Sequence, residues 1–262
     1  VVVPEATALF APGALLSFAP SEIRFSGVEL YLTINEDGAP SSPAGFLAVL
    51  AGSAMKDGAI IKRSRQLRVD SSSFTLRSED PALAELSFGE VELEVMMAAD
   101  GTFVASFDGR RLSEKGPGGR ISVAAIGDTG SMDMRLDVKV DDFRLAALSP
   151  FLPQLPEALS DIGSTSGNAN VLLTAGKIVS ADIDMVALRG RLDLNTAGLP
   201  MLEYDTASVI MEYKGEIGSV VLAQSKLALA DGRMLAMSGD VDALHGPTPQ
   251  LALRFRGNRW PI

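Results

Sequence analysis

The sequence contains no cysteine, one histidine and few aromatic residues among its 262 positions. Without cysteine, disulfide bonds, zinc–thiolate sites and a cysteine nucleophile are all excluded. The aromatic residues are 11 Phe, 3 Tyr and 1 Trp. Long apolar runs are also missing, because the longest candidate, residues 45–55, is far shorter than the ~20 residues that a membrane-spanning helix needs.

Positive charge is scarce as well. Lys and Arg total 23 against 33 Asp and Glu, a formal net charge of -10. Nucleic acid is therefore excluded as a partner, since neutralising phosphates takes clustered Lys and Arg. The apolar share of 47% is ordinary for a globular protein, and it excludes a disordered chain. No initiator Met or signal peptide is visible, and we expect the chain to be a fragment of a longer protein.

The apolar residues that are present recur with a period of two. In the segment 132–140, Met132, Met134, Leu136, Val138 and Val140 alternate with charged residues, which is typical of a strand with one apolar and one solvated face. Similar runs cover 23–34, 67–77, 86–97, 183–194, 202–213, 219–229 and 250–256. Such short runs separated by turn residues predict a mainly β protein with a long antiparallel sheet.

Six of these runs share one spacing of apolar positions. In each run the apolar positions are x and x+2, then x+5, and then every second residue after that. The interval from x+2 to x+5 is the step of three. Strict alternation would change face at the step of three, so one extra residue, a β-bulge, is expected there. Repeated bulges bend and twist a sheet. The three-residue steps are predicted at 25–28, 69–72, 88–91, 185–188, 204–207 and 222–225.

Turns and short helices are predicted between the strands. Asp100-Gly101, Asp108-Gly109 and Asp231-Gly232 are turn signals. Ser42 before Pro43 predicts the start of a helix near 43–55. A second helical segment is expected near 142–160, with Asp141 as its cap and with prolines that break it, and we expect the insert 141–162 to pack on the apolar face. The whole chain, 1–262, is interpreted as one continuous segment.

No catalytic constellation is evident, and we do not expect an enzyme. His245 is the single histidine and lies in a Gly/Pro turn without a local partner. Ser53 and Lys56 have the Ser-x-x-Lys spacing of acyl-transferring enzymes, but the companion motifs are missing. The carboxylates at 137–142 and 182–184 lack the spacing of a calcium site. No metal and no cofactor is expected.

The segment 136–194 contains an ordered series of short motifs. A predicted strand that ends in Asp is followed by a predicted helix rich in Leu and Pro, around Phe151-Leu152-Pro153 and Leu155-Pro156, and by a strand of small residues that contains Gly167-Asn168. Gly176-Lys177 and a further repeat come next. This order resembles the AsmA-like superfamily, and the likeness is greatest to the YhdP-type members and the TamB-related bridge-like lipid transfer proteins.

Two further segments carry the same resemblance, which extends over roughly residues 20 to 262. The pair of strands at 67–77 and 86–95 is similar to the paired strands of this family, and Trp260-Pro261 stands where such chains commonly carry a Trp-Pro. The resemblance implies an open, taco-like β-groove. It also implies a periplasmic location, with the full-length protein tethered in the inner membrane and reaching towards the outer membrane through parts outside this fragment.

The partner that the resemblance implies is phospholipid, with the acyl chains lying along the apolar face. Aliphatic lining without polar groups suffices for acyl chains, which need no specific hydrogen bonds. The candidate lining residues are Phe25, Leu30, Leu32, Phe74, Leu76, Phe88, Leu93, Val95, Met185, Leu192, Leu194, Val209, Met211, Leu227 and Leu229. The alternatives are a non-catalytic structural or interaction β module of the cell envelope with a filled core, and a hydrolase based on Ser53 and Lys56.

Overall fold

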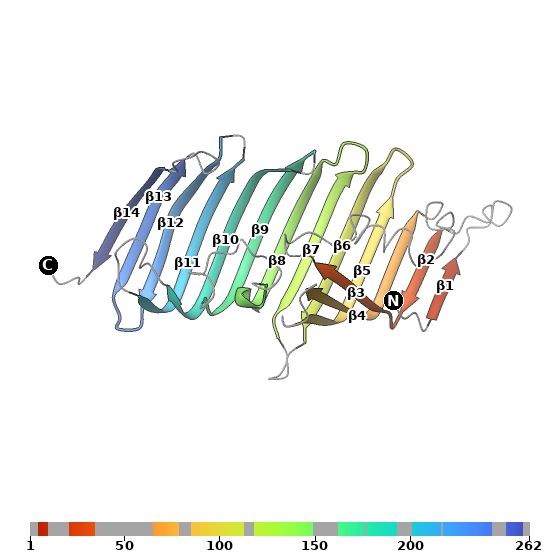
Figure 1. The fold of residues 1–262 in the computed structure, drawn as a ribbon, viewed down its shortest axis with the longest axis horizontal. Coiled ribbons are helices and arrows are strands. Elements are labelled where there is room, and N and C mark those ends of the chain that lie inside the picture. Colours follow the sequence, from red (N-terminus) through yellow and green to blue (C-terminus); the bar gives the residue numbers. More distant parts are fainter. Residues whose placement is uncertain are drawn as a thin grey trace. The chain divides into compact units, whose positions relative to one another are not determined.

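The structure is a computed structural model, and it describes residues 5–9, 21–34, 65–78, 85–112, 118–148, 162–175, 177–192, 201–215, 217–242 and 250–258. Nearly all of these residues lie in strands. The chain divides into two compact units, the first holding the strands up to Asp128 and the second holding those from Met134 onward. In each unit the sheet is curved and does not close on itself (Figure 1), which confirms the predicted fold class.

The first unit contains seven strands. They are β1 (Glu5–Leu9), β2 (Glu22–Ser26), β3 (Glu29–Ile34), β4 (Gln66–Ser78), β5 (Leu86–Met97), β6 (Thr102–Arg111) and β7 (Arg120–Asp128). The order across the sheet is β1-β2-β4-β5-β6-β7, with β3 also beside β4. β2 and β3 both run parallel to β4, which departs from the predicted antiparallel pattern. The parallel arrangement is possible because the chain between β3 and β4 is long enough for a crossover.

The second unit is antiparallel throughout. Its strands are β8 (Met134–Arg144), β9 (Ser164–Thr174), β10 (Lys177–Leu192), β11 (Leu202–Lys214), β12 (Ser219–Leu229), β13 (Met234–Asp242) and β14 (Gln250–Asn258). Each strand pairs with the next one along the chain. This meander places residues that are close in sequence side by side.

Bulges occur at four of the six predicted three-residue steps, and a break between two strands occurs at a fifth. The register shifts between Val69 and Ser72 in β4, and between Gly89 and Glu92 in β5. Corresponding shifts occur at Tyr204/Thr206 in β11 and at Leu222/Ser225 in β12. Between β2 and β3 the break falls at Gly27, whose φ is +66°. The extra residue keeps the apolar side chains of each strand on one face.

The sixth step is misplaced in the prediction. In β10 the buried residue is Ala187 and not Leu188, whose side chain is 52% exposed. The residue with a positive φ is Arg189, at +50°, so the step of three runs from Ala187 to Gly190. The prediction failed because it favoured the larger aliphatic side chain. Pairing decides otherwise, because Ala187 lies opposite the buried Ala207 of β11.

The predicted helical segment at 142–160 is wrong where the structure describes it. Residues 141–144 continue β8, and one 3-10 turn, η3 (Leu145–Leu148), follows. The strand persists because β8 has its own bulge: Asp142 has a φ of +50°, and the register shifts between Val140 and Phe143. Phe143 is thereby fully buried. Residues 149–161 and the helix predicted at 43–55 lie outside the described residues.

Two of the three turn predictions are confirmed. The carboxylate of Asp100 accepts hydrogen bonds from the backbone and hydroxyl of Thr102, at 3.0 and 2.7 Å, and Asp231 accepts one from the Arg233 backbone at 3.1 Å. Asp108-Gly109 instead lies inside β6. A Cβ atom at Gly109 would lie 3.0 Å from the ring of Phe107, so a larger residue there would displace that ring.

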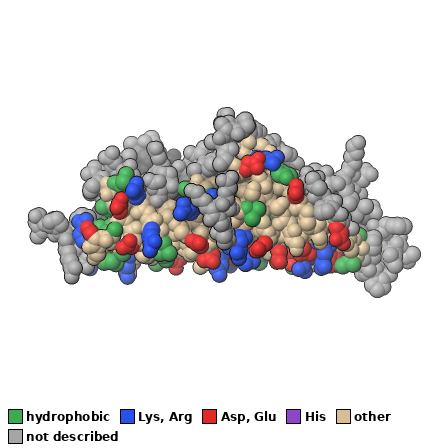
Figure 2. Space-filling model, turned by 90° about the horizontal axis from the view of Figure 1, so that it is seen from below, with side chains coloured by type: hydrophobic (Ala, Val, Ile, Leu, Met, Phe, Trp, Pro, Cys, Tyr) green, Lys and Arg blue, Asp and Glu red, His purple; other side chains and the backbone are tan. Residues whose placement is uncertain are grey.

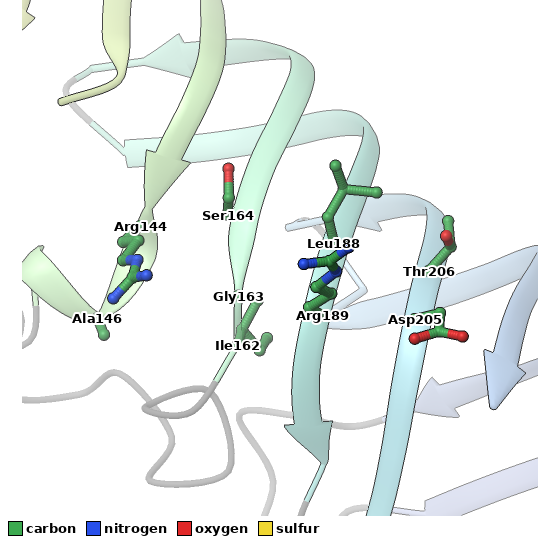
Figure 3. A pocket seen from close by; sticks show the side chains of 9 residues that line it. All are labelled: Arg144, Ala146, Ile162, Gly163, Ser164, Leu188, Arg189, Asp205 and Thr206. Atoms are coloured by element: carbon green, nitrogen blue, oxygen red, sulfur yellow. The ribbon is translucent and has the colours of Figure 1, made fainter. Parts of the chain in front are cut away.

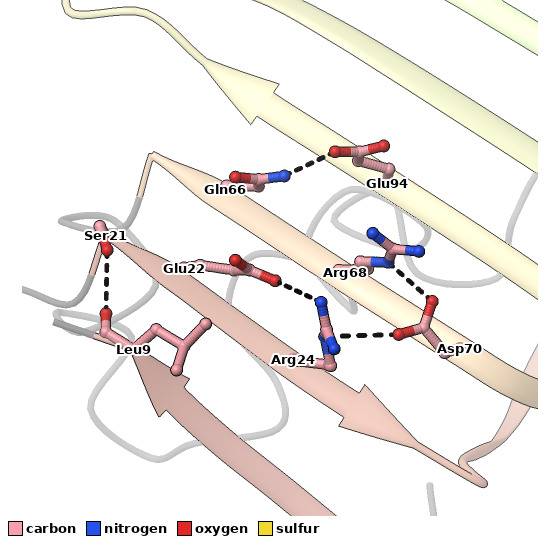
Figure 4. Close-up of polar contacts among 8 residues, drawn as sticks. All are labelled: Leu9, Ser21, Glu22, Arg24, Gln66, Arg68, Asp70 and Glu94. Atoms are coloured by element: carbon pink, nitrogen blue, oxygen red, sulfur yellow. Dashed lines mark hydrogen bonds and ion pairs between the residues drawn. The ribbon is translucent and has the colours of Figure 1, made fainter. Parts of the chain in front are cut away.

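The face opposite the apolar one is solvated and charged. In Figure 2 red and blue side chains gather along one side of the sheet. In the first unit Arg24 contacts both Glu22 and Asp70, at 3.2 and 3.5 Å, and Arg68 contacts Asp70 at 2.8 Å. Figure 4 shows this row crossing β2 and β4. Exposed ion pairs of this kind add little stability, so the main effect of these charged side chains is to keep this face solvated.

Candidate functional site

The apolar face of the first unit is mostly closed, with Leu32, Leu76 and Phe107 half-buried. Its side chains are at most 9% exposed at thirteen positions: Ile23, Phe25, Val28, Leu30, Leu67, Val69, Phe74, Leu86, Phe88, Val91, Leu93, Val95 and Phe103. Three rings from β4, β5 and β6 pack together in its middle. Phe74 lies 6.2 Å from Phe88 and 6.0 Å from Phe107 between ring centroids. This part of the face behaves as an ordinary filled core.

The second unit has a closed zone at one end of its apolar face. The buried cluster consists of Ala187, Leu202, Tyr204, Ala207, Leu227, Leu229 and Leu235. Ile162 packs against it from outside the sheet. Three of these residues follow the bulges of β11 and β12, so the bend in the sheet coincides with the closed zone.

Beyond the closed zone, the apolar face of the second unit is half-buried. The register places Val138, Ala169, Ile183, Met211 and Leu222 in one row across β8 to β12. Only the small Ala169 is buried, and the four larger side chains stay partly accessible. At about 4.8 Å between neighbouring strands, the row is about 19 Å long. We refer to these five residues as the half-open row.

A second row runs alongside the half-open row. Met185 lies directly opposite Val209, and both side chains are half-buried. Both residues face the same side as the half-open row, because their positions differ by two from Ile183 and Met211. The second unit therefore presents partly accessible aliphatic side chains and no charged side chain in these two rows.

The predicted lining residues divide into three groups. Those that are buried are Phe25, Leu30, Phe74, Phe88, Leu93, Val95, Leu227 and Leu229. Those that are half-buried are Leu32, Leu76, Met185, Val209 and Met211. Leu192 ends β10, and Leu194 lies outside the described residues. All side chains in the first two groups lie on the apolar face, and the second unit brings Met185, Val209 and Met211 together next to the half-open row.

Two buried serines replace aliphatic side chains at the bulges, and they form equivalent hydrogen bonds in the two units. The Ser72 hydroxyl accepts a hydrogen bond from the Val28 N–H at 3.0 Å and donates one to the Asp70 carbonyl at 2.8 Å. The Ser225 hydroxyl accepts from the Ile210 N–H at 3.2 Å and donates to the Ala223 carbonyl at 2.9 Å. Each serine thus satisfies backbone groups that a bulge takes out of the ladder.

Tyr204 fills the closed zone and brings a polar group into it. Burial raises the pKa of its phenol, although the Gly163 N–H, which hydrogen-bonds the phenol oxygen, partly opposes this. A Cβ atom at Gly190 would lie 2.4 Å from that oxygen, and one at Gly163 would lie 1.9 Å from the Leu188 carbonyl oxygen. Only glycine fits at both positions.

A pocket of about 790 Å³ opens at this end of the second unit. Its lining comes from the end of β8, the start of β9 and the bulges of β10 and β11 (Figure 3): Arg144, Ala146, Ile162, Gly163, Ser164, Leu188, Arg189, Asp205 and Thr206. The sequence pattern did not predict this pocket. Its position depends on the bulge at Arg189, which the apolar spacing placed elsewhere.

The residues considered for catalysis cannot be placed in the structure. Ser53, Lys56 and His245 lie outside the described residues. In the part of the chain that the structure covers, no three His, Asp or Glu side chains are grouped so that they would hold a metal ion. The same residues contain no helix with the length and apolarity required to cross a membrane.

Comparison with protein-family models, with curated proteins and with solved structures found no match to this chain. The resemblance to the AsmA-like superfamily therefore stays a prediction from the sequence.

Proposed function

We propose that this chain is a segment of an AsmA-like envelope protein and that its apolar face carries the acyl chains of phospholipids. In the full-length protein this segment would lie in the periplasm, between an inner-membrane tether and the outer membrane. The observation that carries the proposal is the half-open row with its neighbours Met185 and Val209. These side chains are aliphatic and continuous across five strands, and all of them except the small Ala169 are partly accessible.

The physical argument concerns what covers such a face. Contiguous accessible apolar side chains on a protein surface mark a place where another apolar group binds. Acyl chains suit this face because they form no hydrogen bonds, and the two rows present no polar partner. The half-open row runs across successive strands. An elongated ligand such as an acyl chain can therefore lie along it and contact each strand in turn.

The alternative is a structural β module with a filled core. The closed apolar face of the first unit favours it for that unit, where Phe74, Phe88 and Phe107 pack together. In the second unit the same description fits only the closed zone around Tyr204. The two functions therefore differ in what they predict for Met185, Val209 and the half-open row.

The test compares two neighbouring residues of β11. Val209 is half-buried on the apolar face, and Ser208 points to the charged face. Purified Val209→Asp should lose most of the phospholipid that copurifies with the wild type, as quantified by mass spectrometry, and Ser208→Asp should retain it. Leu93 is unsuitable for a charged substitution, because it is 4% exposed and a buried unpaired charge would unfold the first unit.

Equal lipid content in the two variants, or wild-type protein free of lipid, would contradict the proposal and favour the filled-core module. Circular dichroism of each variant confirms that the strands are retained. Both substitutions add one carboxylate to the same strand. A difference in lipid content between them is therefore due to the face of the sheet on which the carboxylate lies, and not to the added charge itself.

A further inference from the structure

The pocket lined by Arg144, Ser164 and Arg189 contains polar and charged groups, which acyl chains do not bind. Arg144 lies opposite Ser164, and Ser164 lies opposite Leu188, which lies opposite Thr206. These four residues therefore form a row across β8, β9, β10 and β11. Their neighbours Phe143, Thr165, Ala187 and Ala207 are buried on the apolar face, so the row lies on the charged face.

Two arginines stand on either side of β9 in this pocket. Arg144 ends β8 and Arg189 lies in the bulge of β10 (Figure 3). Two strand spacings, about 10 Å, separate their backbones. A guanidinium group at the end of a long flexible side chain can cross half of that distance, so both groups can contact one ligand placed over Ser164.

Neither guanidinium is used in an ion pair with another described residue. The arginines that do form such pairs are Arg24, Arg68, Arg77, Arg110, Arg120, Arg135, Arg191 and Arg233. The Asp142 carboxylate, two residues before Arg144, already accepts a hydrogen bond from the Ser164 hydroxyl. Arg144 and Arg189 thus keep their donors for a ligand.

The backbone around the pocket is held in place by features that a plain strand lacks. Arg189 has a φ of +50°, and a bulge of this kind redirects a side chain. Gly163 and Gly190 allow β9 to begin directly against β10 and Tyr204, where any side chain would collide. The position of Arg189 relative to Ser164 is therefore set by packing.

We propose that this pocket binds a phosphate ester. The planar guanidinium fork matches phosphate oxygens in a bidentate manner. Of the carboxylates nearby, Asp205 lines the pocket, and Asp142 accepts the hydrogen bond of the Ser164 hydroxyl. The volume of about 790 Å³ lies within the usual range for small-molecule sites. Ile162 and Leu188 supply an apolar wall for the organic part of the ligand.

The ligand is small, or is the end of a larger amphiphile. A long polyanion is excluded because the carboxylates of Asp141, Asp142 and Asp184 are exposed on the same face. The phosphate ester can belong to a lipid headgroup at a membrane surface or to a soluble organic phosphate. This site lies on the face opposite the proposed acyl-chain rows and does not depend on that function.

The test uses isothermal titration calorimetry with sn-glycerol 3-phosphate, and flotation with vesicles of phosphatidylglycerol. Vesicles of a neutral galactolipid without phosphate are the comparison. We expect Arg144→Gln and Arg189→Gln each to weaken binding at least about tenfold, the scale of one charge-assisted contact. Arg135→Gln, an exposed arginine of β8 outside the pocket, should leave the affinity unchanged.

Asp205→Asn should change the affinity for phosphate in the opposite direction from the arginine variants. Removing the charge of Asp205 from the pocket lining should tighten phosphate binding about two- to threefold, because a repulsive charge is lost. Thermal unfolding of each variant verifies that the sheet is intact.

Each outcome has a defined meaning. Saturable binding of glycerol 3-phosphate that needs both arginines assigns a soluble organic phosphate, and arginine-dependent binding to phosphatidylglycerol vesicles alone assigns a lipid headgroup. The proposal is overturned if neither probe binds, or if Arg144→Gln and Arg189→Gln bind as Arg135→Gln does. Loss of copurifying lipid in Val209→Asp is a separate readout, so failure of one proposal leaves the other standing.

Discussion

At the scale of single residues, the buried hydroxyls of Ser72 and Ser225 explain how a sheet with so many bulges avoids unpaired backbone groups. Each hydroxyl accepts an N–H from the neighbouring strand and donates to the carbonyl two residues earlier in its own strand. The sequence pattern did place both serines on the apolar face. Their role was not predictable, because it depends on which backbone groups the bulge leaves without partners.

Replacing Ser225 by alanine tests this role. Ser225→Ala leaves the Ile210 N–H without its acceptor in a buried place, and we expect a loss of about 1–3 kcal/mol in the free energy of unfolding. Ser208→Ala, at a half-buried serine of β11 on the charged face, should change it by less than about 0.5 kcal/mol. Urea denaturation of the two variants measures the difference, and equal values would refute the role.

Asp108 provides a pH-dependent test in the first unit. Burial raises the pKa of its carboxyl, but the hydrogen bonds from Arg120 and Ser122, at 2.7 and 2.5 Å, outweigh burial and lower it overall. A carboxyl with a lowered folded-state pKa stabilises the fold above its unfolded value of about 3.9, and this contribution is lost as the pH falls through the folded value.

We therefore expect Asp108→Asn to be less stable than the wild type by about 1 kcal/mol at pH 7. The gap should begin to narrow below about pH 4, where the carboxyl of the unfolded chain becomes protonated, and it should close once the pH falls below the lowered folded-state pKa. Chemical denaturation at the two pH values measures the gap. A gap that stays constant down to pH 2 would show that the ionised carboxyl does not contribute.

At the scale of elements, the bulged strand is the unit that repeats in this chain. Five steps of three in the apolar spacing matched breaks in the strands or in their register, because a face that must stay buried reveals where the extra residue lies. The step in β10 was misplaced, since Ala187 and Leu188 both satisfy the spacing and only pairing with β11 decides between them. The bulge of β8 was missed, because Asp141 and Asp142 were interpreted as a helix cap.

The bulge of β5 reverses the usual preference of a strand for β-branched residues. Glu90 is exposed and has a φ of +52°, a conformation that is costly for valine and easy for glycine. We expect Glu90→Val to be destabilised by about 1–2 kcal/mol relative to Glu90→Gly.

The relative stability of the valine and glycine variants should be reversed at Glu92, an exposed residue two positions later in the same strand. There Glu92→Val should be more stable than Glu92→Gly by about 1 kcal/mol, as in a regular strand. Thermal unfolding of the four variants measures both differences. The same order at both positions would contradict the assignment of the bulge.

At the scale of the whole chain, the two units share one construction and differ in how far the apolar face is closed. Aromatic side chains close the face in the first unit, and aliphatic side chains leave part of it accessible in the second. The alternation of apolar and charged residues was enough to predict an open β-sheet. It was not enough to predict accessibility, because Leu93 and Val209 each follow a three-residue step by two positions, yet only Leu93 is buried.

The central claim is that acyl chains lie on the apolar face of the second unit. The most direct measurement places a benzophenone amino acid at position 209 or 208, and at 185 or 186, and illuminates the purified protein with phospholipid vesicles. Positions 209 and 185 face the apolar side, and their neighbours face the charged side. We predict crosslinks to phospholipid that are several-fold more abundant from 209 and 185. Equal crosslinking from both members of each pair, or none from either, would contradict the claim.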